Sequence, residues 1–336
     1  MRHPLARVLI LLLLGIGSCL AGCGREEPAP PPPGGPKGAS AFRLAVAAHE
    51  VEHSIPLEFF RNGIGKPDPR DVIPALFDPQ FAAARDVRYL PDEARVIVLE
   101  IERDARAYPL AFLDRHELVN DLVGGVPVLI SWCPLCVSSV VYEREVEGQL
   151  LTFGVSGYLY RSDVLMYDHQ TESFWSQLHQ GAVAGPQTGT PLTVIPSRVT
   201  SLDAFRRERP AGKVLRGGTG MLPPAAYGRS PYAGYADSPR IWFPVGTLRD
   251  DLPPKAEVIG LAQGGDSCAF PLDVLARAPE GVTRHVVGGK RFTLLHDAVG
   301  RSVSVRDDEG TPVAATRLFW FAWQAFHPRT RVFAPR

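Results

Sequence analysis

Short β-branched stretches recur along the chain with the alternation that strands require. Arg95–Ile101 and Val126–Trp132 have this pattern, and Val258–Leu261 and Arg291–Leu295 show it again further on. Two consecutive glycines lie between Arg95–Ile101 and Val126–Trp132, and two more lie between Val258–Leu261 and Arg291–Leu295. Each Gly-Gly marks a turn. The pattern therefore predicts two strand–turn–strand units.

Residues 140–146 and 149–155 alternate between apolar and polar positions on either side of Glu147-Gly148, which predicts a β-hairpin. Helix periodicity is rarer. It favours short helices at Leu202–Arg209 and Arg317–His327, and a further short helix at Asp114–Leu122.

The two strand–turn–strand units resemble each other in sequence. Val96–Leu110 overlies Val258–Leu272 at a constant offset of 162 residues, with seven of fifteen positions identical. Matches in the same order over this much chain indicate an internal duplication. We expect an α+β fold with a strand majority, divided into two related lobes at residues 39–220 and 221–336.

The amino terminus has the pattern of an export signal. Arg2 and Arg7 precede an apolar run that ends at Leu20-Ala21-Gly22-Cys23. This run is shorter than the roughly 20 residues that span a bilayer. The sequence Leu-Ala-Gly-Cys looks like a lipobox, so we expect cleavage of residues 1–22 and lipidation of Cys23.

Residues 23–38 are rich in proline and glycine and predict an extended tether. With the lipid on Cys23, the sequence predicts an exported protein, anchored to the bacterial cell envelope and facing the periplasm or the exterior. The chain holds 36 basic and 36 acidic side chains, so its formal net charge of zero argues against nucleic-acid binding. The sequence identifies no protein partner.

Cys133-Pro-Leu-Cys136 directly follows a predicted strand and is the sharpest chemical motif. Two thiols at this spacing can form a structural disulfide, act as a redox pair, or supply two ligands to a soft metal such as copper or zinc. Cys268 lies on a predicted core strand, where we expect a buried, inert thiol. The sequence does not decide between these uses or establish that the chain is an enzyme.

A soft metal needs more ligands than two thiols. The candidates near the pair in sequence are acidic side chains and His116, Met166, His169 and His179. Residues 152–177 are dense in serine, acidic, glutamine and aromatic side chains, which suits either a ligand-binding cleft or a loop that satisfies its own backbone.

Several short motifs appear in one order along the chain. They are His116-Glu-Leu-Val-Asn-Asp121, Cys133-Pro-Leu-Cys136, Phe153-Gly-Val-Ser-Gly157, Ser162-Asp163, Leu165-Met-Tyr-Asp168, Thr171-Glu-Ser173 and Trp175-Ser-Gln177. In this combination the chain resembles the bacterial family called domain of unknown function 3179, from about Ile55 to Pro335. The resemblance implies an exported or lipid-anchored protein and no established activity.

The resemblance singles out a set of polar and aromatic residues, all in or just after the first copy of the duplication. These are His116, Glu117, Asn120, Asp121, Cys133, Cys136, Ser156, Ser162, Asp163, Asp168, Trp175 and Gln177. The chain departs from the family pattern at Val137, where we expect a small residue such as glycine.

We therefore predict that Cys133, Cys136 and His116 form a catalytic or metal-binding site for thiol–disulfide exchange or soft-metal handling. We expect the flanking substrate contacts to come from Ser156, Ser162, Asp163, Asp168, Trp175 and Gln177. The alternative is a non-catalytic binding or assembly module in which the two cysteines form a structural disulfide.

Overall fold

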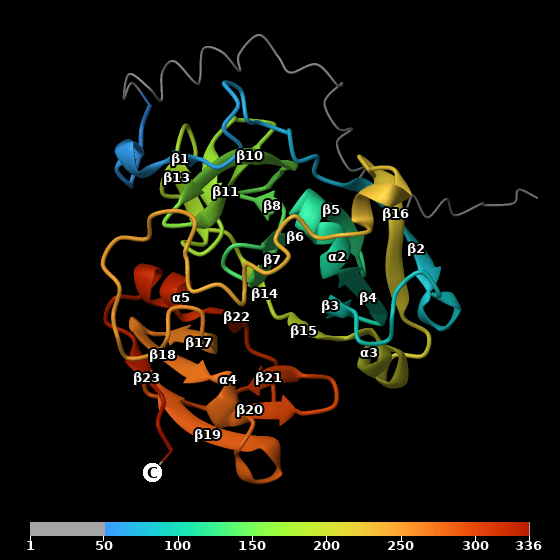
Figure 1. The fold of residues 1–336 in the computed structure, drawn as a ribbon, viewed down its shortest axis with the longest axis vertical. Helices are drawn as coiled ribbons and strands as arrows, with labels where there is room; N and C mark the ends of the chain where they lie inside the picture. The colour runs from blue at the N-terminus through green and yellow to red at the C-terminus, as the bar shows by residue number, and fades with distance from the viewer. Residues whose placement is uncertain (1–50, 336) are drawn as a thin grey trace, which may run out of the picture.

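The computed structural model describes residues 51–335 and is built mainly from strands. Its strands form five small sheets in the manner of a five-bladed β-propeller (Figure 1). With 43% strand and 13% helix, the predicted α+β class with two lobes is wrong. The predicted signal at residues 1–22, the lipidation site Cys23 and the tether at 23–38 lie outside the described residues.

We number the sheets I to V and give their strands in spatial order. Sheet I is β15 (Arg198–Ser201), β3 (Arg95–Ile101), β4 (Asp104–Pro109), β16 (Lys213–Thr219) and β2 (Phe77–Ala83). Sheet II is β14 (Val194–Ile195), β7 (Ser138–Glu143), β6 (Val126–Cys133) and β5 (Leu118–Val123). Sheet III is β1 (Arg61–Asn62), β10 (Phe153–Tyr160), β11 (Asp163–Asp168), β12 (Phe174–Ser176) and β13 (Gly181–Ala184).

The second half of the chain forms two further sheets. Sheet IV is β22 (Thr316–Phe319), β17 (Glu257–Gln263), β18 (Asp266–Pro271) and β23 (Arg331–Val332). Sheet V is β19 (Val282–Val287), β20 (Lys290–Asp297) and β21 (Ser302–Arg306). A separate small hairpin pairs β8 (Glu145–Val146) with β9 (Gln149–Leu150).

The helices are short and lie between strands: α2 and α4 connect different sheets, whereas α3 and α5 each connect two strands of one sheet. They are α2 (Leu110–His116), α3 (Leu202–Glu208), α4 (Leu272–Leu275) and α5 (Trp320–Phe326), with 3₁₀ turns η1 (Leu57–Phe59), η2 (Ala84–Asp86), η3 (Pro224–Tyr227) and η4 (Pro279–Gly281). The predicted helix at Asp114–Leu122 is wrong, because α2 ends at His116 and β5 begins at Leu118. Among the described residues, no helix is long and apolar enough to cross a membrane.

Within residues 51–335, the 162-residue offset corresponds to a repeated pair of sheets and not to a second lobe. In sheet I Val96 lies opposite Pro109, and in sheet IV Val258 lies opposite Pro271. The order β15-β3-β4-β16 matches β22-β17-β18-β23, and β5-β6-β7 matches β19-β20-β21. Sheet III, formed mainly by β10–β13, has no such counterpart in the second pair. The predicted boundary at 220/221 falls just after β16.

In both repeats, a glycine of the Gly-Gly turn lets one hairpin approach the backbone of another. Gly124 has φ +56°, and a Cβ there would lie 2.6 Å from the carbonyl oxygen of Ile101. Gly288 has φ +53°, and a Cβ there would lie 2.0 Å from the carbonyl oxygen of Gln263, which corresponds to Ile101 in the other repeat. Only glycine permits this approach of one hairpin to the next.

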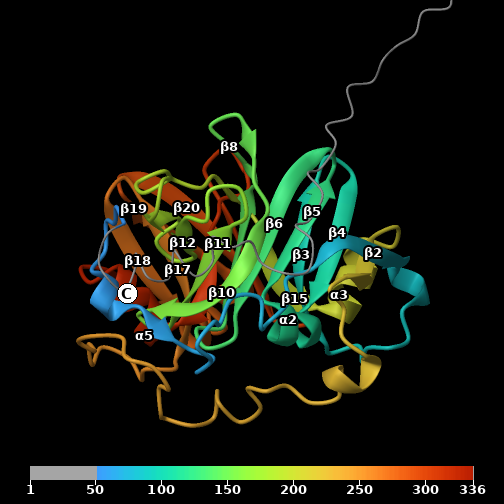
Figure 2. The ribbon, with the colours of Figure 1, turned by 90° about the horizontal axis from the view of Figure 1, so that it is seen from above.

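The largest buried cluster joins sheets II, III and IV, so the candidate site lies inside shared packing. It contains Cys133 and Cys136 together with Trp175 from sheet III and Trp320 from α5. Residues 220–256 cross one side of the molecule between sheets I and IV (Figure 2). Tyr235 of this long segment also belongs to the cluster, so the segment covers part of the cysteine region.

Candidate metal centre

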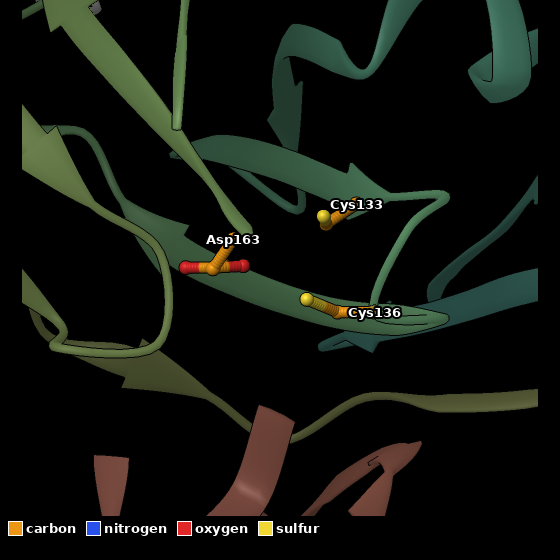
Figure 3. Close-up of side chains that lie close together, drawn as sticks. All are labelled: Cys133, Cys136 and Asp163. Carbon is orange, nitrogen blue, oxygen red and sulfur yellow. The ribbon is translucent and has the colours of Figure 1, made fainter. Parts of the chain in front are cut away.

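The structure brings two of the predicted site residues together with a third from a neighbouring sheet. Cys133 ends β6, Cys136 lies in the turn before β7, and Asp163 begins β11. Their ligand atoms all lie within 4.8 Å of one another. In Figure 3 the two sulfur atoms and the Asp163 carboxyl face the same small space.

The turn that holds the cysteines is tight. Cys133 pairs with Ser138 across β6 and β7, so residues 134–137 must reverse the chain. Val137 does so with φ +54°, a conformation that β-branched residues rarely adopt. This explains why a glycine is expected there. The amide of Phe319, at the end of β22, donates to the carbonyl oxygen of Cys136 at 2.9 Å and ties the turn to sheet IV.

The turn that presents Asp163 is equally constrained. Tyr160 pairs with Asp163, which leaves Arg161 and Ser162 as a two-residue connection, with φ +52° and +68°. Two positive φ values suit the twist of a hairpin, but asparagine and glycine are the usual residues there. Backbone strain of this kind clusters at functional sites.

The cluster is closed to solvent and polar at its centre. Cys133 exposes 1% of its surface, and Cys136 and Asp163 expose 0%. The Ser162 carbonyl oxygen lies 3.2 Å from Sγ of Cys136 and 3.8 Å from Sγ of Cys133. Oδ2 of Asp163 accepts the amide of Leu178 at 2.9 Å. The other oxygen, Oδ1, is buried with no hydrogen-bond partner, and so is the Ser162 hydroxyl.

Burial keeps the acidic groups of the cluster protonated. It raises the pKa of Asp163 to about 8, although the Leu178 and Val164 amides and the Cys133 thiol oppose the rise. Burial, together with the neighbouring Cys133, raises the pKa of Cys136 well above its usual value. Such shifts are reversed when a cation binds the same atoms, because it stabilises their charged forms.

A second buried carboxyl lies beside the cluster. Glu117 directly follows α2 as its C-cap residue, with φ +57°, and exposes 7% of its surface. Burial raises its pKa to about 8, with further increases from Asp163 and Asp114, while a hydrogen bond from Tyr232 opposes them. Tyr232 belongs to the long segment 220–256, so this segment meets the edge of the site.

His116, the predicted third ligand, is not part of this group. Its Nδ1 lies 2.7 Å from the carbonyl oxygen of Pro74, and its Nε2 lies 2.5 Å from the hydroxyl of Tyr227. Both ring nitrogens therefore have partners elsewhere. Asp163, which we expected to contact substrate, lies beside the thiols in its place.

Of the other predicted substrate contacts, four are buried and hydrogen-bonded to the protein itself: Ser156, Asp168, Trp175 and Gln177. The fifth, Ser162, is buried and its hydroxyl has no partner. Asp168 accepts the indole N–H of Trp175 at 2.9 Å and the hydroxyl of Thr171 at 2.7 Å. The Ser156 hydroxyl donates to the carbonyl oxygen of Leu165. The side chains of Asp168, Trp175 and Ser156 thus hold sheet III together.

Gln177 connects sheets II and III. Its Oε1 accepts the Ser138 hydroxyl at 2.6 Å, and its Nε2 donates to the Ser131 hydroxyl at 3.0 Å. Asn120 makes a second bridge, because its amide group donates to and accepts from the backbone of Phe153 at 2.9 and 2.8 Å. These bridges join sheets II and III, which carry Cys133 and Asp163.

Sequence reasoning missed Tyr232 and Tyr235 as neighbours of the site. Tyr235 is buried in the same cluster as the cysteines, and its hydroxyl has no hydrogen-bond partner. The one signal available was the grouping of Tyr232, Tyr235 and Trp242 in a segment otherwise rich in proline and glycine. Cys268, in contrast, is buried in a different cluster, as predicted.

Comparisons with known proteins agree with the ordered motifs. The profile of one protein family, described as protein of unknown function (DUF3179), matches residues 70–330. No curated protein matches the chain, and no solved structure does. Because the match covers most of the chain, including the cysteine turn and Asp163, this protein belongs to the DUF3179 family.

Proposed function

We propose that Cys133, Cys136 and Asp163 bind a soft transition-metal ion such as zinc or copper(I). The observation that carries this proposal is the unpartnered Oδ1 of Asp163, buried beside two free thiols. Buried polar atoms nearly always have partners, so an unpartnered carboxyl oxygen within 4.8 Å of two sulfur atoms suits a cation ligand.

The spacing supports the same proposal. Two sulfur ligands on a tetrahedral zinc ion lie about 3.8 Å apart, given Zn–S distances of about 2.3 Å. The three ligand atoms already lie within 4.8 Å of one another, so small side-chain movements would close the site. Three protein ligands leave a fourth position, as in zinc sites that bind a further small ligand.

The lack of a positively charged partner for the buried carboxyls also supports metal binding. Within residues 51–335, neither Asp163 nor Glu117 has an arginine or lysine partner. Two thiols and two carboxyls are therefore buried together without a positive charge. A bound cation would offset the charge that appears when these groups lose their protons.

Thiol–disulfide exchange has less support. It requires an accessible thiolate, whereas both sulfur atoms are sealed and the pKa of Cys136 is raised. A structural disulfide within a binding or assembly module stays a second candidate, because the two sulfur atoms lie within 4.8 Å of each other in a chain whose sequence predicts export. Its reduction potential would lie below about −300 mV.

The test is metal uptake by the reduced full-length chain, measured by titration with Zn²⁺ and, in a separate arm, with Cu⁺. We expect about one ion per chain at a three-ligand site. Cys133→Ser, Cys136→Ser and Asp163→Asn should lose it, while Cys268→Ser, a matched substitution of a buried thiol in another cluster, should keep it. Uptake that is absent, or that Asp163→Asn leaves unchanged, would overturn the proposal.

His116→Gln separates this site from the one expected from the sequence. His116 has partners at both ring nitrogens, so its replacement should leave zinc stoichiometry unchanged. We also propose that the chain is exported and held at the cell envelope by a lipid on Cys23, on the basis of the lipobox and tether in the sequence.

A further inference from the structure

A groove of about 520 Å³ lies apart from the cysteine cluster, where sheets I, II, IV and V meet. Each of these sheets contributes an apolar side chain to its wall, namely Val98, Ile195, Ile259 and Val305. Its volume is in the range of small-molecule sites, which combine apolar walls with a few placed polar groups.

The charged side chains of the groove are mostly arginines. Arg198, Arg209, Arg306 and Arg317 line it, against the single carboxylate of Glu100. Glu100 is already engaged, since its Oε2 lies 2.6 Å from Nη2 of Arg209. The groove therefore presents a surplus of positive charge to anything that enters it.

Arg306 is the least neutralised of these arginines. Its Nη1 donates to the carbonyl oxygen of Gly310 at 2.6 Å, and no carboxylate pairs with it in the described part of the chain. Arg198 and Arg317, in contrast, pair with Glu208 and Glu257.

Two further arginines, Arg95 and Arg301, lie next to Arg317. Nη1 of Arg317 and Nη2 of Arg95 both donate to the carbonyl oxygen of Arg301, at 2.9 and 3.4 Å. Nε of Arg95 is buried and has no partner. Glu257 attracts Arg95, whereas Arg301 and Arg317 repel it. Arg95 is therefore less well satisfied than Arg317, which also pairs with Glu257.

The acidic groups nearby neutralise three of the four groove arginines and leave Arg306. Asp307 directly follows Arg306 at the end of β21, and its carboxylate accepts the amide of Thr311 at 2.7 Å. Glu100, Glu208 and Glu257 each already pair with an arginine. Guanidinium groups bind carboxylates and phosphates through parallel N–H donors, so Arg306, which no carboxylate of the described residues neutralises, suits such a ligand.

We propose that this groove binds an organic anion whose charged group meets the arginines and whose apolar portion lies on the valine and isoleucine wall. Alkyl phosphates and alkyl carboxylates have this chemistry. The site is built from both repeats, because sheets I and II belong to the first and sheets IV and V to the second. It is independent of metal binding at the cysteine cluster.

The test is binding of octyl phosphate, below its micelle concentration, to the full-length chain by isothermal titration calorimetry. Octyl phosphate should bind at least about tenfold more tightly than inorganic phosphate, because only the former contacts the apolar wall. Octylammonium should not bind. Equal affinity for octyl phosphate and octylammonium would show adsorption to apolar surface alone and overturn the proposal.

Two variants locate the site. Arg306→Gln should weaken octyl phosphate binding about tenfold, since it removes a charged donor. The matched control Arg85→Gln removes one charge from a side chain that is 79% exposed on η2 and should change affinity less than about twofold. Unchanged binding by Arg306→Gln would place the ligand elsewhere and refute the assignment.

Ser304 lines the groove beside Val305 and gives a second, independent variant. Ser304→Asp should abolish octyl phosphate binding through repulsion, whereas Ser304→Asn, similar in size and uncharged, should retain it. If both variants fold and bind like the wild type, the groove is not the site.

Discussion

Sγ of Cys136 lies 3.2 Å from the carbonyl oxygen of Ser162, and this contact joins the two chain segments that form the cluster. Ser162 directly precedes Asp163, so one hairpin turn supplies both a backbone acceptor for the thiols and the nearby carboxyl. A thiol that donates to a carbonyl is held in its protonated form. Metal binding at this site must therefore release protons.

The metal-free protein should lose stability as pH rises, because of Asp163. The folded pKa of about 8 exceeds the ordinary value of 3.8, so this contribution is fully present below about pH 4 and is lost as pH rises toward 8. Urea unfolding of metal-free wild type and Asp163→Asn from about pH 5 to 8 checks this. The wild type should lose up to about 1.4 kcal/mol per pH unit relative to the variant. Parallel pH profiles would contradict the buried, protonated carboxyl of Asp163.

Glycine should be more stable than alanine at position 137. Both substitutions remove the half-buried Val137 side chain, but only alanine keeps a Cβ at φ +54°. We expect Val137→Gly to exceed Val137→Ala by about 1 kcal/mol in free energy of unfolding, the reverse of the usual order. Equilibrium denaturation of the two variants measures the difference. An alanine variant at least as stable as the glycine variant would show that the turn relaxes.

Arg144→Leu should be strongly destabilising. Arg144 is fully buried and donates to the carbonyl oxygens of Val128, Leu151 and Asp121, at 2.9, 2.7 and 3.1 Å. Its loss leaves buried acceptors unpaired, which we expect to cost about 3 kcal/mol or more. Chemical denaturation measures the cost. Arg85→Leu, on an exposed side chain, is the control, and its free energy of unfolding should stay within about 0.5 kcal/mol of the wild type. A similarly small effect of Arg144→Leu would mean that water replaces the lost donors.

Cys23→Ser should release the protein from the membrane fraction. A lipid on Cys23 is the anchor that the sequence predicts, and serine cannot carry it through a thioether. Fractionation of cells that express the two forms, with detection of the chain in each fraction, checks this. Cys268→Ser is the matched control and should partition like the wild type. Membrane association that persists in Cys23→Ser would point to another mode of attachment.

The sequence alone determined the strand segments and the repeat. Strands β3 and β6 have the predicted bounds to within a residue, and Leu202–Glu208 is helical as expected. Period-two alternation and paired glycines are local properties, so they can be detected without the fold. The ordered motifs identified the family for the same reason.

The tertiary structure decided how these segments assemble and which side chains meet. The repeat suggested two lobes, yet β-sheets pair over long distances: β15 joins β3 across about a hundred residues, and the inserted sheet III packs against both repeats. The third member of the cysteine cluster is Asp163 and not His116, because sheet III packs against sheet II, to which Gln177 and Asn120 tie it. Spacing along the chain carries no information about such contacts between sheets, whereas burial and hydrogen bonding in the folded protein fix them.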